Sequence, residues 1–239
     1  MPIVTIGSET DDASWKVLCR LGGTTALIAV LVAPAEIVIG FLPGVARTLA
    51  STVTVIDWFT LFQDNWFLGL RSFGLLNLFG AALLAPTILA IYSAIRRNDE
   101  AYAAFGTIAF FVGIAVYLAT NRAFPMLSLS GQYASATTDV ERSLLVAAGQ
   151  AMLAEGQNRG GVLLIESACF FISAVMLRTD TFTKMTACAG MLGNGLLMVV
   201  EIAFMPPRGV GMAIAACGGL SMMTWYLLIG RRLLLLGRL

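Results

Sequence analysis

Six long apolar segments constrain the fold of this chain more than any other feature. They cover residues 18–42, 66–95, 102–120, 161–177, 185–205 and 209–229. A helix that crosses a bilayer needs roughly 20 mostly apolar residues, and each segment is close to or above that length. The 239 residues are 58% hydrophobic and only 12% charged, with a mean hydropathy of +0.85. We therefore predict an all-α integral membrane protein, built as a bundle of six transmembrane helices.

One long polar passage, 121–160, separates the first three apolar segments from the last three. Within it, Thr138 and Glu141 have the spacing of a capping box, in which two side chains satisfy backbone amides at the start of a helix. Apolar residues then recur at helical spacing, at Val140, Leu144, Ala147, Ala148, Ala151 and Met152. We predict an extracytoplasmic helical cap over the bundle, either a rigid connector or a mobile lid over a site. The chain would then have a cytoplasmic tail, 1–17, and a single transmembrane domain, 18–239.

The distribution of Lys and Arg predicts the orientation in the membrane. Nine basic residues fall on the side of the N-terminus: Lys16, Arg20, Arg96, Arg97, Arg178, Lys184, Arg231, Arg232 and Arg238. Five fall on the other side, in longer loops: Arg47, Arg122, Arg142, Arg159 and Arg208. Because short cytoplasmic loops carry an excess of Lys and Arg, we expect both termini in the cytoplasm and the chain in the plasma membrane.

The composition excludes several classes of function. The chain has no histidine, which excludes zinc sites, haem sites and proton relays that use this residue. Its four cysteines, Cys19, Cys169, Cys188 and Cys217, lack paired spacing, so we expect free thiols and no metal site. The net charge is only +1, and the basic residues are scattered along the chain rather than clustered, so the sequence gives no sign of a nucleic-acid partner. We expect no cofactor.

Charged residues inside the apolar segments are the strongest pointer to function, because an intramembrane charge costs about 2.5 to 3.5 kcal/mol on insertion scales. Glu36, Arg71, Glu166 and Glu201 all fall about five or six residues from the outer end of their segments. Arg122 borders the same layer. Since the inner half has no matching acids, we predict an outward-opening acidic pocket rather than a continuous pore. The alternative is that these residues only form ion pairs that fix the packing.

Small residues on the last segment suggest close helix packing. Gly211, Ala215 and Gly219 repeat every four residues, as in helices that approach each other closely in membranes. This face could pack within the fold, on a second copy or on a partner in a membrane complex. Asn77 and Asn194 are polar positions within apolar segments, and we expect them to form hydrogen bonds between helices.

The cap and the C-terminus carry a resemblance to a known group of proteins. The stretches are Asn-Arg-Ala-Phe-Pro-Met-Leu-Ser-Leu-Ser from residue 121, Gln-Tyr-Ala from 132, Ala-Thr-Thr-Asp from 136, Ala-Ala-Gly-Gln-Ala-Met-Leu-Ala from 147 and Trp-Tyr-Leu-Leu-Ile-Gly-Arg-Arg-Leu from 225. They resemble uncharacterised prokaryotic multi-span proteins of the family catalogued as domain of unknown function 4386. The resemblance covers about a third of the chain, and it implies six spans without implying functional residues.

Three functions are compatible with these features. The first is a non-enzymatic protein that binds or transports a small cationic or amphiphilic ligand, or a lipid head group, in the acidic layer. The second is an accessory subunit that packs on membrane lipids and on a partner through the small-residue face. The third is an intramembrane enzyme that uses two Glu residues as acid and base on a lipid-linked substrate. No nucleophile is paired with a base, so we do not expect an enzyme.

Overall fold

The computed structural model describes residues 7–40, 54–154, 159–202 and 208–238, and it describes side chains within 14–32, 54–154, 159–202 and 209–238. Every regular element in these residues is an α-helix. The bounds are α1 Gly7–Gly40, α2 Val55–Asp64, α3 Trp66–Ser72, α4 Leu75–Ile95, α5 Glu100–Ala119, α6 Ala123–Ser135, α7 Asp139–Ala154, α8 Arg159–Met176, α9 Lys184–Ile202 and α10 Arg208–Leu236.

Within the described part of the chain, six candidate spans are long and apolar enough to cross a membrane. They are Ser14–Val32, Leu75–Ile95, Glu100–Ser135, Asp139–Met176, Lys184–Ile202 and Gly209–Leu236. The third candidate span includes α5 and α6. The fourth includes α7 and α8, and residues 155–158 between these two helices lie outside the described part of the chain. The prediction of an all-helical membrane-type chain with six candidate spans is therefore confirmed by length and composition.

The second candidate span begins later than the sequence predicts. The apolar segment 66–95 is divided into α3, which ends at Ser72, and α4, which begins at Leu75. Gly74 lies between them with a φ of +88°, a left-handed conformation that glycine adopts without steric cost. The prediction of one continuous helix from Trp66 was therefore wrong, and Arg71 lies on a short helix ahead of the span.

The chain forms two compact units. The first, which we call the bundle unit, consists of Met1–Leu31, Ala81–Ala115 and Gly160–Leu239. The second, which we call the small unit, consists of Val32–Gly80 and Val116–Arg159.

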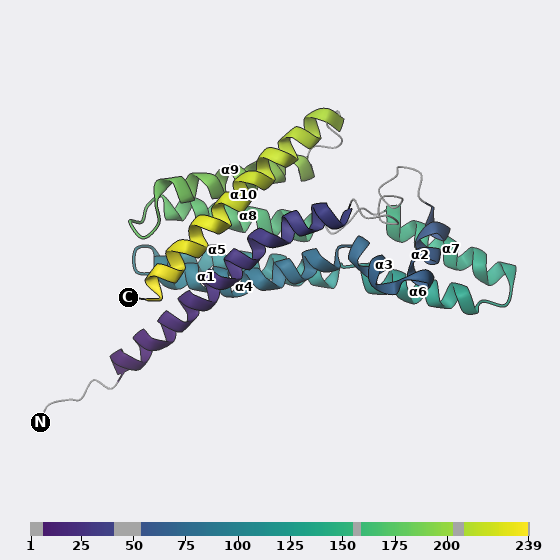
Figure 1. The fold of residues 1–239 in the computed structure, drawn as a ribbon, viewed down its shortest axis with the longest axis horizontal. Helices are drawn as coiled ribbons and strands as arrows, with labels where there is room; N and C mark the ends of the chain where they lie inside the picture. The colour runs from purple at the N-terminus through teal and green to yellow at the C-terminus, as the bar shows by residue number, and fades with distance from the viewer. Residues whose placement is uncertain (1–6, 41–53, 155–158, 203–207, 239) are drawn as a thin grey trace, which may run out of the picture. The chain divides into compact units, whose positions relative to one another are not determined.

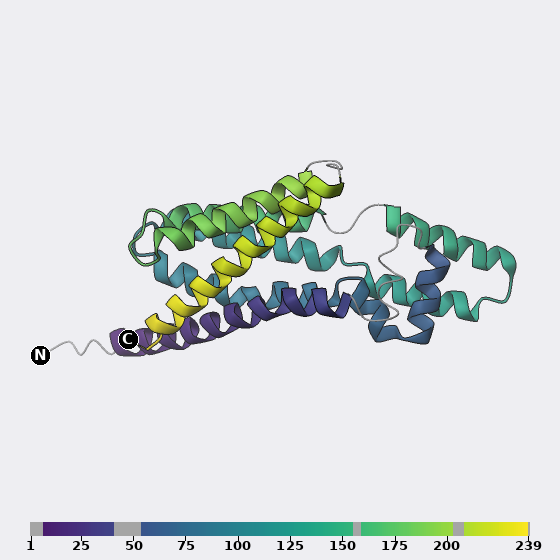
Figure 2. The ribbon, with the colours of Figure 1, turned by 45° about the horizontal axis from the view of Figure 1, so that its top comes forward.

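The helices of the bundle unit pack closely at glycines. A Cβ at Gly22 of α1 would stand 2.7 Å from the carbonyl oxygen of Pro86 in α4. A Cβ at Gly23 would stand 2.9 Å from the carbonyl oxygen of Gly230. At this point the C-terminal part of α10 crosses α1 (Figures 1 and 2). Small residues permit this backbone approach, which is a main source of helix association in membranes.

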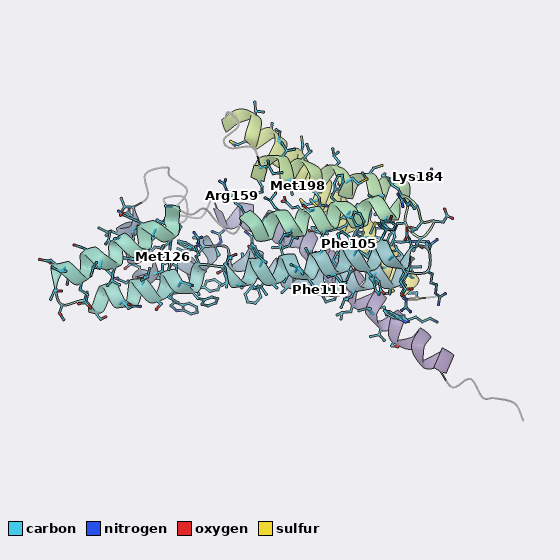
Figure 3. All side chains as sticks on the ribbon, turned by 180° about the vertical axis from the view of Figure 1, so that it is seen from behind. Phe105, Phe111, Met126, Arg159, Lys184 and Met198 are labelled. Atoms are coloured by element: carbon cyan, nitrogen blue, oxygen red, sulfur yellow. The ribbon has the colours of Figure 1, made fainter. Side chains whose placement is uncertain are left out.

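One end of the bundle unit is held by hydrogen bonds between side chains and distant backbone. The guanidinium of Arg20, in the first part of α1, donates to the carbonyl oxygen of Gly237 at 2.7 Å. That of Arg232 donates to the carbonyl oxygen of Thr181 at 2.6 Å. The start of α1, the end of α10 and the connection before α9 therefore lie at one end of this unit, where Figure 3 labels Lys184. Most of the basic residues that the sequence assigns to one side of the membrane lie on these segments.

The small unit has its own apolar core, formed by α2, α3, α6 and α7. Phe59 of α2 and Met126 of α6 are both fully buried there, and Figure 3 labels Met126. The Ser130 hydroxyl donates to the Phe59 carbonyl oxygen at 2.8 Å and ties α6 to α2. These helices include most of the predicted cap together with residues from before the second span, so the compact element is larger than the passage 121–160.

Helix α7 begins with the predicted capping pair in a modified form. The Glu141 backbone amide donates to the Thr138 hydroxyl at 3.2 Å, as predicted, but the Glu141 carboxylate accepts from the backbone amide of Thr137. Of the six apolar residues that the sequence places at helical spacing on this helix, Met152 packs on the core, and the prediction was wrong for the other five, which are exposed. Val140 and Leu144 are 72% and 67% exposed, while Val146, Gly149, Met152 and Leu153 pack on the core.

Candidate functional site

The five residues of the predicted charged layer fall into different units. Glu166 of α8 and Glu201 of α9 belong to the bundle unit. Glu36, Arg71 and Arg122 belong to the small unit, and the side chain of Glu36 lies outside the described residues. The candidate site described here is therefore the glutamate pair with its neighbours in the bundle unit.

Glu166 is buried inside the bundle unit. The residue is 8% exposed, and one oxygen of its carboxylate, Oε2, has no hydrogen-bond partner within the described part of the chain. The preceding residue, Ile165, presses its backbone against α5, where a Cβ at Gly113 would stand 2.8 Å from the Ile165 nitrogen. A buried carboxylate without a partner is costly, so this position calls for a proton or a cation.

Glu201 lies near enough to Glu166 for the two carboxylates to repel each other. A contact beside the pair shows how α8 and α9 are aligned: the Ser167 hydroxyl lies 3.9 Å from the sulfur of Met198, which Figure 3 labels on α9. Ser167 follows Glu166 directly, and Met198 precedes Glu201 by about one helical turn. The structure therefore brings these two predicted site residues together.

Two further ionisable groups surround Glu166, and the sequence analysis did not identify either as part of a site. The Cys169 thiol, on the same helix, is 1% exposed, and the Tyr226 hydroxyl comes from α10. Both lie within electrostatic range of the Glu166 carboxylate. The only signal in the sequence was the spacing of Glu166 and Cys169, which places them on one face of α8.

A second polar group lies deeper in the same interface. Ser173 of α8, Asn194 of α9 and Trp225 of α10 are each 0% exposed. They meet at Gly190, where a Cβ would collide with the Ser173 hydroxyl oxygen and the Trp225 indole nitrogen. The Asn194 amide nitrogen donates to the Gly190 carbonyl oxygen at 2.7 Å, so the predicted hydrogen bond to another helix is instead within α9.

The two arginines of the predicted layer, Arg71 and Arg122, lie in the small unit. Arg71 is 6% exposed, on α3. A guanidinium nitrogen of Arg122 donates to the Met152 carbonyl oxygen at 2.5 Å and so joins the connection before α6 to the end of α7. Arg122 therefore stabilises the packing of this unit.

The chemistry available at the glutamate pair is that of two carboxylates, a thiol and a phenol in an apolar surrounding. Among the described residues, no group of three or more Asp, Glu or Cys side chains is arranged to hold a metal ion. Comparison with models of known protein families, with curated proteins and with solved structures found no match. The resemblance to the family catalogued as domain of unknown function 4386 therefore stays an expectation, and a function for this chain has to be inferred from the geometry of the site.

Proposed function

We propose that this chain is a non-enzymatic, multi-pass membrane protein that binds a small cationic or amphiphilic ligand at Glu166 and Glu201. The observation that carries the proposal is the buried Oε2 atom of Glu166, which has no hydrogen-bond partner in the described chain and lies beside a second carboxylate. Two neighbouring negative charges in a low dielectric repel each other, so a positive charge between them is favoured. An amine or quaternary ammonium on an apolar body fits that requirement.

The apolar surrounding favours a ligand with a hydrocarbon or aromatic body. Next to Glu166, Ile165 packs on Gly113 of α5, and Met198 of α9 lies beside the pair, in contact with Ser167. Binding sites for amphiphiles combine such walls with a small number of charged groups that fix the orientation. Transport across the membrane would follow if the same site opened to each side in turn, with both termini in the cytoplasm.

The test uses tetraphenylphosphonium, a permanent cation with an apolar body, and the purified chain in nanodiscs. We expect saturable binding that weakens at least about tenfold in a Glu166→Gln, Glu201→Gln double variant, which corresponds to about 1.4 kcal/mol. Glu100→Gln is the matched control, because Glu100 begins α5 and is exposed. Equal affinity in the wild type and the double variant would show that the carboxylates bind no cation.

A second candidate function, an accessory subunit that packs on a partner or on a second copy, is supported by α10. Its span is only 17% buried, less than any other of the six candidate spans. Gly219 has nothing within 4 Å of the place of a Cβ, although the neighbouring Gly218 packs on Leu196 and Leu197 of α9. The predicted small-residue face, Gly211, Ala215 and Gly219, therefore has room at Gly219 for another helix.

Cysteine cross-linking in membranes tests this second candidate. The native Cys217 is exposed and lies on α10, so Cys217→Ser supplies the background. We expect Gly219→Cys to form a disulfide-linked dimer, and Thr224→Cys, exposed on a different side of α10, to form none. Monomers at both positions, with no partner captured by a photo-reactive group at residue 219, would remove this function.

A further inference from the structure

The polar group at Gly190 has hydrogen-bonding atoms that the protein does not satisfy. The Asn194 carbonyl oxygen Oδ1 and the Trp225 indole nitrogen Nε1 have no hydrogen-bond partner among the described residues. The Asn194 amide nitrogen is engaged with the Gly190 carbonyl oxygen, which fixes the orientation of its side chain. One acceptor and one donor are therefore buried on residues that contact Gly190, each at a cost of about 1 to 3 kcal/mol if left unpaired.

The third member of the group supplies a hydroxyl at the same point. The Ser173 hydroxyl donates its hydrogen to the Cys169 carbonyl oxygen at 2.8 Å, so its oxygen keeps lone pairs that accept. A molecule that accepts from the indole and donates to both the amide oxygen and the hydroxyl would satisfy all three residues. Water has this combination of one oxygen acceptor and two hydrogens.

The same faces of α8 and α9 connect this group to the glutamate pair. Ser173 follows Glu166 by seven residues on α8, and Asn194 precedes Glu201 by seven residues on α9. Seven residues are two helical turns, about 10 Å along the axis. On α8, Cys169 lies between the two levels, and the Tyr226 hydroxyl of α10 lies within electrostatic range of both Cys169 and Glu166. The Trp225 and Tyr226 rings are 5.3 Å apart between centroids. Groups with exchangeable hydrogens therefore follow one another along the interface.

We propose that Ser173, Asn194 and Trp225 form an internal water site between α8, α9 and α10, through which protons reach Glu166 from the middle of the bundle. The bound water accepts from the Trp225 indole and donates to the Asn194 carbonyl oxygen. A proton moves when a second water, on the side away from Glu166, gives a proton to the bound water. The bound water then releases one of its own protons to the Ser173 hydroxyl oxygen, and Ser173 releases its original hydroxyl proton toward Glu166, so that each oxygen gains one proton and loses one. Asn194 and Trp225 orient the water and exchange no proton with the carboxylate themselves.

This site extends the proposed function, because a proton route would let Glu166 and Glu201 exchange a proton for a cationic ligand. The water site itself rests only on the three buried residues. The sequence predicts an acidic layer on the outer side alone. In the structure, uncharged polar groups continue along the helices below that layer. On α9 they continue to Thr186, which is 3% exposed and whose hydroxyl lies 2.9 Å from that of Thr183.

The first test measures water at Trp225 directly. In 15N-tryptophan-labelled protein in nanodiscs, the Trp225 indole N–H is assigned by comparison with a Trp225→Phe variant. We expect magnetisation transfer from water to this N–H. In heavy water, we expect deuterium to replace the indole hydrogen within minutes to hours. An indole N–H without transfer from water, and protonated for days in heavy water, would overturn the water site without the need for any site variant.

The second test measures proton access one turn closer to Glu166. In a chain that keeps Cys169 and replaces the other three cysteines by serine, the infrared S–H band of Cys169 reports hydrogen exchange at a fully buried thiol. We expect Ser173→Ala and Asn194→Leu to slow this exchange at least tenfold. The matched control is Thr107→Val, since Thr107 is a buried residue on α5 that is satisfied by the Ala103 carbonyl oxygen at 2.8 Å.

The outcomes separate this proposal from the function proposed above. Tetraphenylphosphonium affinity that is the same in the wild type and in the Glu166→Gln, Glu201→Gln variant, with intact water contact at Trp225, would overturn the ligand site alone. Retained binding with a dry Trp225 would overturn the water site alone. Unchanged Cys169 exchange in Ser173→Ala, a variant that removes one oxygen and adds no bulk, would overturn the proton route.

Discussion

Gly113 of α5 offers the sharpest test of the packing that positions Glu166. A Cβ at this position would stand 2.8 Å from the backbone nitrogen of Ile165 and 3.1 Å from the backbone carbonyl carbon of Leu164. Backbone atoms of α8 cannot rotate away as a side chain can, so Gly113→Ala has to push the two helices apart. Gly195 of α9 is the matched control, since its nearest neighbours are ring atoms of Phe170 at 3.5 and 3.6 Å.

The expected magnitudes follow from two opposing effects. Replacing glycine by alanine inside a helix gains roughly 0.5 to 1 kcal/mol of helix stability, at either position. Overpacking against atoms that cannot move costs about 1 to 3 kcal/mol, and only Gly113 meets such atoms. Gly195→Ala should therefore be stabilising or neutral, and Gly113→Ala should be less stable than Gly195→Ala by about 1 to 3 kcal/mol.

The assay is equilibrium unfolding in mixed micelles, with the free energy of unfolding read from far-ultraviolet circular dichroism as denaturing detergent is titrated. Because Ile165 precedes Glu166, the displaced α8 should also weaken tetraphenylphosphonium binding in Gly113→Ala. Equal unfolding free energies for the two alanine variants would refute the close approach of α5 and α8.

Three further predictions concern other contacts. In the small unit, hydrogen bonds from the backbone amide and the hydroxyl of Thr54 lower the pKa of the Asp57 carboxyl. The stability that this cap contributes is therefore present above the ordinary pKa of about 3.9 and is lost as the pH falls through the folded value. In Thr54→Ala the Asp57 pKa, followed by carboxyl NMR, should rise toward its ordinary value, and no rise would contradict the cap. Ser130→Ala removes a buried hydrogen bond to α2 and should destabilise the small unit by about 1 to 2 kcal/mol, measured as faster proteolysis within α6, whereas an unchanged cleavage rate would argue against the bond. Arg178→Gln should change the unfolding free energy by less than about 0.5 kcal/mol, because the ion pair with Asp99 is 3.8 Å long and the Arg178 side chain is 68% exposed; a larger loss would show that the pair is structural.

The six candidate spans could be predicted from the sequence because their signal is length and hydropathy, which need no knowledge of contacts. The break at Gly74 could not, since glycine within an apolar run is compatible with a continuous helix and only its positive φ ends α3. The packed face of α7 was also missed. Val140 and Leu144 have helical spacing, but the core of the small unit is met by Val146 and Gly149, and hydropathy does not distinguish two apolar faces of one helix.

For the site, the sequence identified Glu166 and Glu201 because charges in apolar segments are rare. It did not point to Tyr226 near Glu166, nor to Ser173 and Trp225 in the second polar group, because each is an ordinary residue of a membrane helix until the register of α8, α9 and α10 is known. Asn194 was recognised as a buried polar group, but its hydrogen bond within α9, which leaves Oδ1 facing the interface, depends on that register.

Cross-linking between residues 166 and 201 tests the account most directly, because everything proposed here depends on α8 and α9 holding these two side chains together. In a chain without native cysteines, we predict that Glu166→Cys with Glu201→Cys is joined by a short, membrane-permeable bismaleimide. Glu166→Cys with Met185→Cys should stay unlinked, since Met185 lies 16 residues before Glu201 on α9, on the order of 24 Å along the helix. Efficient linkage of residue 166 to residue 185 but not to residue 201 would contradict the account.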